Sequence, residues 1–209
     1  MDDSASLENA YRKAFKFLTI IMLPMVVAMI FFSEEFITLL LGDKFLPAVP
    51  AFKVLSIVFG LMFVSVLLLR ILTALGRQQF GTLCIGIALM INVLLDVILI
   101  PRMGFMGATW ATLLAEIVLI TAAFFYVTKY LTPLSLTKIL YGPCGGAVLM
   151  ALCCMWLLHS SLLTKVLFFL PLSLLIYLAY LVVTKTLTAE EYQWFRSILK
   201  NLRGRALQG

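Results

Sequence analysis

The chain is divided into nearly uncharged apolar blocks of roughly 20 residues, and this feature constrains its fold most strongly. An α-helix rises about 1.5 Å per residue, so a block of this length crosses the ~30 Å hydrocarbon core of a bilayer. Of the 209 residues, 63% are hydrophobic and 12% are charged. Soluble domains average roughly 45–50% apolar residues, and a water-soluble core cannot absorb such an excess. The sequence therefore predicts an all-α integral membrane protein with a bundle of about six transmembrane helices.

Short polar or proline-containing connections separate the blocks. The predicted spans are approximately 14–32, 51–75, 82–100, 107–127, 139–158 and 166–184. Together, residues 1–185 form the predicted transmembrane domain. After the first span, Ser33 resembles a helix N-cap and Gly42 a helix end, which predicts a short helix at the membrane interface. Residues 186–209 predict a cytoplasmic, amphipathic, basic tail that rests on an anionic leaflet.

Two local patterns predict how neighbouring spans pack. The connection from Pro101 to Gly107 is short, so the third and fourth spans must be antiparallel neighbours. In the fifth span, Gly142 and Gly146 have the spacing that allows close contact between helices. A chance pair of small residues beside Pro143 explains that spacing equally well.

The distribution of basic residues predicts the orientation of the chain. If the N-terminus is inside, 12 of the 16 Lys and Arg residues lie in inner segments. The remaining four are Lys44, Lys53, Arg102 and Lys165. By the positive-inside rule, both termini are expected in the cytoplasm. Because the basic residues lie in connections between apolar blocks, the net charge of +6 does not indicate nucleic-acid binding.

Arg70, Asp96 and Glu116 are the informative charged residues, because a charge in hydrocarbon costs roughly 2.5–3.5 kcal/mol on insertion scales. Asn92 and Asp96 are four residues apart and share one helical face, and Asp96 lies roughly 7–8 Å inside the outer end at Pro101. Thr112 lies one turn before Glu116 on the next span.

The oxygen atoms of Asn92, Asp96 and Thr112 are hard ligands, and they predict a site for Na⁺ or a proton rather than for a soft metal. The alternative is interhelical hydrogen bonding that only holds the two spans together, worth roughly 1–2 kcal/mol. Sequence alone leaves both readings open, because it shows the oxygens without their geometry.

Arg70 has two readings as well. It either extends to the membrane surface or pairs with Glu116, or it is a cavity-facing cation for a substrate phosphate, with Glu116 as a second cavity charge. The sequence contains no Ser/His/Asp constellation, no metal-binding Cys or His spacing and no glycine-rich phosphate loop. We therefore expect no enzyme activity and no cofactor, apart from coupling to Na⁺ or H⁺.

The stretch from Asn92 to Glu116, including Pro101 and Gly107, resembles the signature region of polysaccharide and lipid-linked oligosaccharide flippases. These proteins belong to the multidrug/oligosaccharidyl-lipid/polysaccharide exporter superfamily. Leu23-Pro24, the segment from Phe36 to Phe45, and Ala74-Leu75-Gly76-Arg77 are also similar to segments of that family. The resemblance extends from about Tyr11 to Glu116, and the last two spans match only in hydropathy.

The resemblance implies the last six helices of a 14-span flippase, with the N-terminal lobe missing. Such a protein moves undecaprenyl-pyrophosphate-linked oligosaccharide or polysaccharide precursors, such as O-antigen units, across the bacterial cytoplasmic (inner) membrane. In the lipid II branch, a sodium site draws on residues that match Asn92, Asp96 and Thr112. The alternative is a non-transporting scaffold subunit of an envelope polysaccharide synthesis complex. The expected partners are membrane lipids, a lipid-linked sugar, an N-terminal lobe or polysaccharide synthesis proteins, and no nucleic acid.

Overall fold

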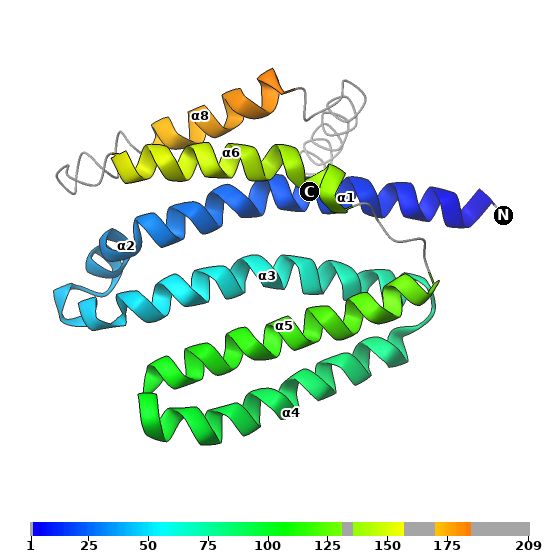
Figure 1. Ribbon diagram of the computed structural model, residues 1–209, viewed down its shortest axis with the longest axis horizontal. Coiled ribbons are helices and arrows are strands. Elements are labelled where there is room, and N and C mark those ends of the chain that lie inside the picture. Colours follow the sequence, from blue (N-terminus) through cyan, green and yellow to red (C-terminus); the bar gives the residue numbers. More distant parts are fainter. Residues whose placement is uncertain (1, 131–135, 157–169, 185–209) are drawn as a thin grey trace, which may run out of the picture.

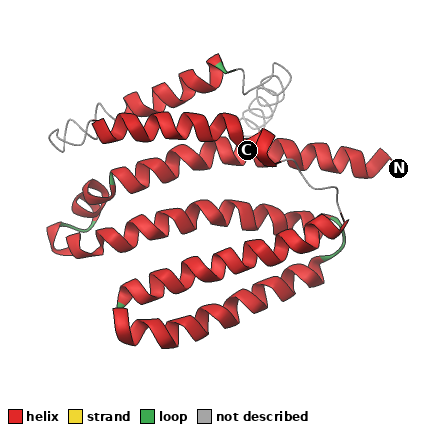
Figure 2. Cartoon of the chain, in the orientation of Figure 1, coloured by secondary structure: helices red, strands yellow, loops and turns green. Residues whose placement is uncertain are grey.

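The computed structural model describes residues 2–130, 136–156 and 170–184, and within these ranges the chain forms helices and turns without a strand (Figure 2). The elements are α1 (Asp2–Phe31), α2 (Ser33–Leu40), the 3-10 helix η1 (Asp43–Ala48), α3 (Val49–Ala74), α4 (Gln78–Met103), α5 (Phe105–Tyr130), α6 (Leu136–Trp156) and α8 (Leu170–Val183). The predicted tail at 186–209 lies outside the described residues.

The long helices lie side by side in a row, in the order α8, α6, α1, α3, α5 and α4 (Figure 1). α1 is in the middle, where it packs on α6 on one side and on α3 on the other. α2 and η1 lie at one end of the row and connect α1 to α3. This order gives two groups of helices, α1–α6–α8 and α1–α3–α5–α4, and α1 belongs to both.

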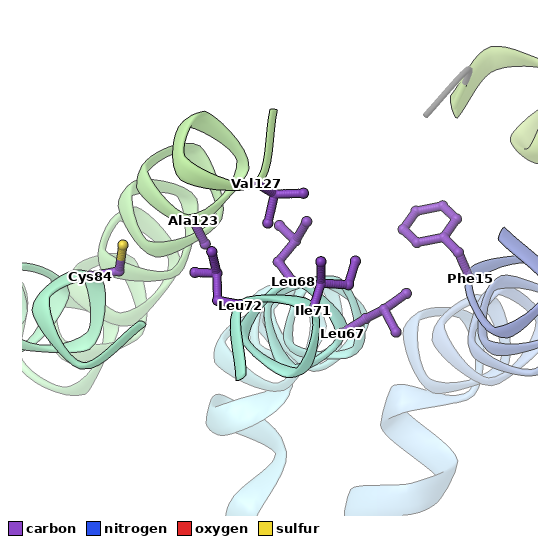
Figure 3. Packing of buried hydrophobic residues seen from close by; sticks show 8 residues of the cluster. All are labelled: Phe15, Leu67, Leu68, Ile71, Leu72, Cys84, Ala123 and Val127. Atoms are coloured by element: carbon purple, nitrogen blue, oxygen red, sulfur yellow. The ribbon is translucent and has the colours of Figure 1, made fainter. Parts of the chain in front are cut away.

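Each group has its own apolar core. The first core joins α1, α3, α4 and α5 through the side chains shown in Figure 3, which are Phe15, Leu67, Leu68, Ile71, Leu72, Cys84, Ala123 and Val127. The second joins α1, α6 and α8 around Tyr177, which is fully buried. The Tyr177 hydroxyl donates a hydrogen bond of 2.9 Å to the carbonyl of Ile20 in α1. The rings of Tyr177 and Tyr180 lie against Gly146, where a Cβ atom would crowd them.

Four segments of the described chain are long and apolar enough to cross a membrane. They are Asn9–Phe31, Asp43–Ala74, Gln78–Met103 and Phe105–Tyr130. Two shorter apolar helical segments, Tyr141–Met155 and Pro171–Val183, account for the described parts of α6 and α8. The all-helical architecture is therefore confirmed, with four helices in the described ranges that are long and apolar enough to span a membrane. The count of six stays a prediction.

The joint between α1 and α2 differs from the prediction. Ser33 is the first residue of α2 rather than its N-cap, and the preceding residue, Phe32, makes no side-chain cap. The chain stays close to helical through the joint, because Phe32 N–H donates to Ala28 and Phe36 N–H donates to Phe32. The Ser33 hydroxyl is buried and has no hydrogen-bond partner among the described residues. The prediction that Gly42 ends α2 is confirmed, because α2 ends at Leu40, Leu41 is its C-cap, and Gly42 follows with a φ of 91°.

The turn between α4 and α5 is tighter than the sequence predicts. Pro101 does not end α4, which continues to Met103, and Gly104 alone separates α4 from α5. Gly104 has a φ of 58°, and its N–H donates to Ile100 at 2.8 Å to close the last turn. Pro101 is tolerated inside α4 because hydrogen bonds of neighbouring residues, such as that from Gly104 N–H, satisfy the last turn of the helix. Asp96 is therefore roughly 10–11 Å from the end of α4, deeper than predicted.

Gly107 brings the backbones of α4 and α5 together. A Cβ atom at this position would overlap the carbonyl group of Leu99 on α4. The hairpin therefore depends on close contact of the two backbones, as small residues permit between membrane helices.

We predict that Gly107→Ala lowers the free energy of unfolding by about 1–3 kcal/mol, because a backbone carbonyl cannot move aside to accept the methyl group. Gly86→Ala on α4 is the matched control, since a Cβ there meets nothing within 4 Å. It should leave stability unchanged or raise it by up to about 1 kcal/mol. Thermal unfolding of the purified chain in detergent measures both, and equal stabilities of the two variants would contradict the packing argument.

One end of the row gathers the N-terminal half of α1, the turn between α3 and α4, and the end of α5 (Figure 1). η1 and the turn between α4 and α5 lie at the other end. The first end carries Arg77, whose guanidinium lies 4.9 Å from the centre of the Tyr130 ring. Phe80 and Tyr126 stack beside it, with ring centroids 4.7 Å apart. A basic, aromatic end is typical of the cytoplasmic interface of a membrane protein.

We predict opposite sidedness for Lys44→Cys and Gln79→Cys, both made in a background without the four native cysteines. Both positions are exposed, and η1, which contains Lys44, lies at the opposite end of the row from the start of α4, which contains Gln79. A membrane-impermeant maleimide should label Lys44→Cys in intact cells, and Gln79→Cys only after permeabilisation. The cysteine-free background is the control. Labelling in the reverse order would overturn the predicted orientation.

Candidate functional site

The three residues predicted as ion ligands lie together on the facing sides of α4 and α5. In the amide orientation that satisfies both neighbours, Asn92 Nδ2 donates to Asp96 Oδ2 at 3.2 Å. Asn92 Oδ1 accepts from the backbone N–H of Thr112 at 3.3 Å. Asn92 therefore connects the carboxylate on its own helix to the backbone of the neighbouring one.

The threonine hydroxyls on α5 direct their protons into their own helix. Thr112 Oγ1 donates to the carbonyl of Ala108 at 2.9 Å, and Thr109 Oγ1 donates to that of Phe105 at 3.0 Å. Each hydroxyl oxygen keeps a lone pair that a cation can use. The Ala108 carbonyl accepts the Thr112 proton in this arrangement.

Two carboxylate oxygens in this hairpin are buried without a hydrogen-bond partner among the described residues. They are Asp96 Oδ1 and Glu116 Oε1. A buried polar atom without a partner is costly, and a carboxylate at membrane depth must be neutralised or paired. Each of these oxygens is therefore a position where a proton or a cation would remove an energetic penalty.

The structure separates Asp96 from Glu116. Because α4 and α5 are antiparallel, Asp96 lies one turn from Asn92 toward Gly104, and Glu116 lies one turn from Thr112 in the opposite direction. These offsets amount to roughly 12 Å along the helix axes. The described residues contain no group of three or more His, Cys, Asp or Glu side chains able to hold a metal ion. One ion therefore cannot use both carboxylates, and the predicted ion site is centred on Asp96.

The orientation of the Asn92 amide determines whether a donor or an acceptor group faces Asp96. In the amide orientation that satisfies both hydrogen bonds, Asn92 Nδ2 faces Asp96 and presents a positive dipole end to the carboxylate. That arrangement repels a cation. With the amide turned over, Oδ1 would face Asp96, and amide and carboxylate oxygens are both hard ligands.

Arg70 lies away from this cluster. Its side chain is exposed on α3, and the structure shows no ion pair between Arg70 and Glu116, whose Oε1 has no partner among the described residues. α3 and α5 run in the same direction, and Leu72 and Ala123 pack in one core. By the helical rise, Arg70 and Glu116 are then roughly 7–8 Å apart along the helix axes. The observed placement favours extension of Arg70 toward the membrane surface over the predicted pairing.

Two features were missed by sequence reasoning. The contact of Arg77 with Tyr130 joins the α3–α4 turn to the end of α5, and the Tyr177 hydroxyl joins α8 to α1. The signal for the first was present, because aromatic residues at span ends commonly lie at the membrane interface. No local pattern predicts the second, since Tyr177 and Ile20 are far apart in sequence.

We predict that Arg70 and Glu116 act independently. The free-energy changes of Arg70→Gln and Glu116→Gln should add to within about 0.5 kcal/mol in the double variant, because the two side chains do not pair. A double-mutant cycle on unfolding in detergent measures this. An interaction energy above about 1 kcal/mol would show that the pair forms after all.

Residues 1–50, which cover α1, α2, η1 and the start of α3, match a family model described as polysaccharide biosynthesis protein. An uncharacterized membrane protein of Methanocaldococcus jannaschii is 29% identical over 135 residues, which are 64% of this chain and 26% of that protein. The chain thus spans about a quarter of the length of this relative. No solved structure matches the chain. The membrane character of this relative agrees with the four apolar spans.

Proposed function

We propose that the chain forms the C-terminal part of an ion-coupled flippase. The unit moves undecaprenyl-pyrophosphate-linked oligosaccharide or polysaccharide precursors across the cytoplasmic membrane. The chain works together with an N-terminal lobe, because the resemblance implies a substrate cavity between two lobes. The match of residues 1–50 to a polysaccharide biosynthesis family supports this class of substrate.

The observation that carries the proposal is the buried, unpartnered oxygen of Asp96 beside Asn92 and Thr112. A structural hydrogen-bond network would satisfy both carboxylate oxygens, since buried polar groups in proteins are normally paired. Asp96 instead has one oxygen held by Asn92 and one without a partner. An ionisable residue in this condition inside a membrane span is typical of ion pathways.

Coupling in this proposal uses a rotation of the Asn92 amide between two orientations. With Nδ2 toward Asp96, a donor occupies the carboxylate, and with Oδ1 toward it, α4 presents amide and carboxylate oxygens to a cation beside Thr112 of α5. An ion that binds only the second state shifts the population toward it, in proportion to its difference in affinity. This shift is the step by which an ion gradient acts on the helices that carry the site.

The test replaces Asp96 with Asn in the gene as it stands in its native membrane and measures surface polysaccharide. We expect export to fall about tenfold or more, because the amide lacks the charge that holds the ion, a loss of at least about 1.4 kcal/mol. Glu34→Gln is the matched control: it removes an acidic group that is exposed on α2, and export should not change. In detergent, NaCl should raise the melting temperature of the wild type above its value in choline chloride, and should not do so for Asp96→Asn.

The two readouts separate the explanations. A fall in export for Asp96→Asn without a sodium effect in the wild type indicates a proton instead of Na⁺ as the coupling ion. Normal export by Asp96→Asn would contradict ion-coupled flipping. Retention of polysaccharide synthesis proteins in a pulldown with that variant would then favour the scaffold function.

A further inference from the structure

An apolar groove lies between α1 and α3. In the row of helices in Figure 1, α5 and α4 lie on the other side of α3. Its lining residues are Leu18, Phe59, Met62, Phe63 and Val66, and its volume is about 280 Å³. Phe59 and Phe63 pack edge to face, with ring centroids 5.1 Å apart, and form one ordered wall. Met62 and Val66 remain about half exposed.

Arg70 lies at the end of this groove. Met62, Val66 and Arg70 are spaced four residues apart, so they follow one another along the same face of α3. Arg70 is one turn, or roughly 6 Å, beyond Val66 toward the basic end of the row. Its side chain is exposed and makes no ion pair with the described residues. Arg70 thus follows the apolar groove directly along this face of α3.

α1 changes from polar to apolar residues at the level of Arg70. The Tyr11 hydroxyl donates to the backbone carbonyl of Arg70 at 3.4 Å, which places Tyr11 level with Arg70. Leu18, which lines the groove, is two turns further along α1 on a similar face. The charged neighbours of Tyr11 on α1 with described side chains are basic, namely Arg12, Lys13 and Lys16. Both helices therefore change from polar and basic to apolar at one level.

We propose that this groove binds one anionic phospholipid, with an acyl chain against Met62 and Val66 and the phosphate at Arg70. Guanidinium groups match phosphate oxygens in geometry and charge. The basic residues nearby favour a headgroup with net negative charge over a zwitterionic one. The site is independent of the ion site, because it uses α1 and α3 and none of the polar residues on α4 and α5.

The test uses native mass spectrometry of the full chain in detergent, with phosphatidylglycerol or phosphatidylcholine of identical acyl chains. The wild type should retain one phosphatidylglycerol in preference to phosphatidylcholine. Arg70→Gln should weaken this binding about fivefold, the effect expected for one basic residue near an anionic lipid. Arg77→Gln is the matched control, because that guanidinium lies over the Tyr130 ring, and it should retain the lipid.

A second pair of variants tests the acyl-chain part of the site while Arg70 stays in place. Val66→Trp fills the groove and should also displace phosphatidylglycerol. Ile57→Trp introduces the same side chain at an exposed position of α3 that does not line the groove, and it should bind the lipid normally.

Three results would overturn the proposal. The first is equal lipid binding by Arg70→Gln and the wild type. The second is competition by inorganic phosphate at the affinity of the whole lipid, which would indicate an anion site that makes no use of the groove. The third is a photo-crosslinker at Met62 that captures protein instead of lipid in native membranes, because a helix would then occupy the groove.

Discussion

The packing of α1 on both of its sides is the interaction on which the rest of the structure depends. α1 contributes Phe15 to the core with α3 and α5, and Ile20 to the core with α6 and α8. The hydroxyl of Tyr177 adds a hydrogen bond to the α1 backbone within the second core. Apolar packing alone discriminates weakly in a membrane, since lipid tails are as apolar as leucine side chains. A directed hydrogen bond and close contacts at glycine therefore specify which surfaces meet.

The α4–α5 hairpin also depends on a close contact at glycine, but this contact leaves a buried polar atom without a partner. Close approach at Gly107 brings the facing sides of the two helices together, and Asn92 then reaches the backbone of Thr112. The same contact leaves one oxygen of Asp96 without a partner among the described residues. A hairpin selected only for stability would pair that oxygen or replace the side chain by an apolar one. The hairpin thus combines tight backbone packing with a local penalty at a single carboxylate.

Much of the fold could be predicted from the sequence, because long apolar blocks and glycine turns are local signals. The helices around 51–75 and 107–127, and the helix end at Gly42, illustrate this. Ser33 and Pro101 were misread, since each is a boundary signal in water but lies here in a chain that continues as helix. Within a bilayer, backbone groups gain more from internal hydrogen bonds than from an early helix end.

The proximity of Asn92, Asp96 and Thr112 was also within reach of sequence reasoning, because a short connection forces two helices to be neighbours. The separation of Glu116 from Asp96 was not, since it depends on the exact register of the two helices. The placement of Arg70 relative to Glu116 likewise depends on how α3 packs on α5. Register and interhelical packing are set by side chains distant in sequence, such as Leu72 and Ala123.

Gly104 has a mechanical consequence. A connection of one residue cannot lengthen, so α4 and α5 cannot slide past one another without breaking the turn. The two helices must therefore tilt or shift together as one rigid unit. Any force applied at Asp96 reaches Thr112 directly, and α3, which packs on both helices, is the element that receives this motion.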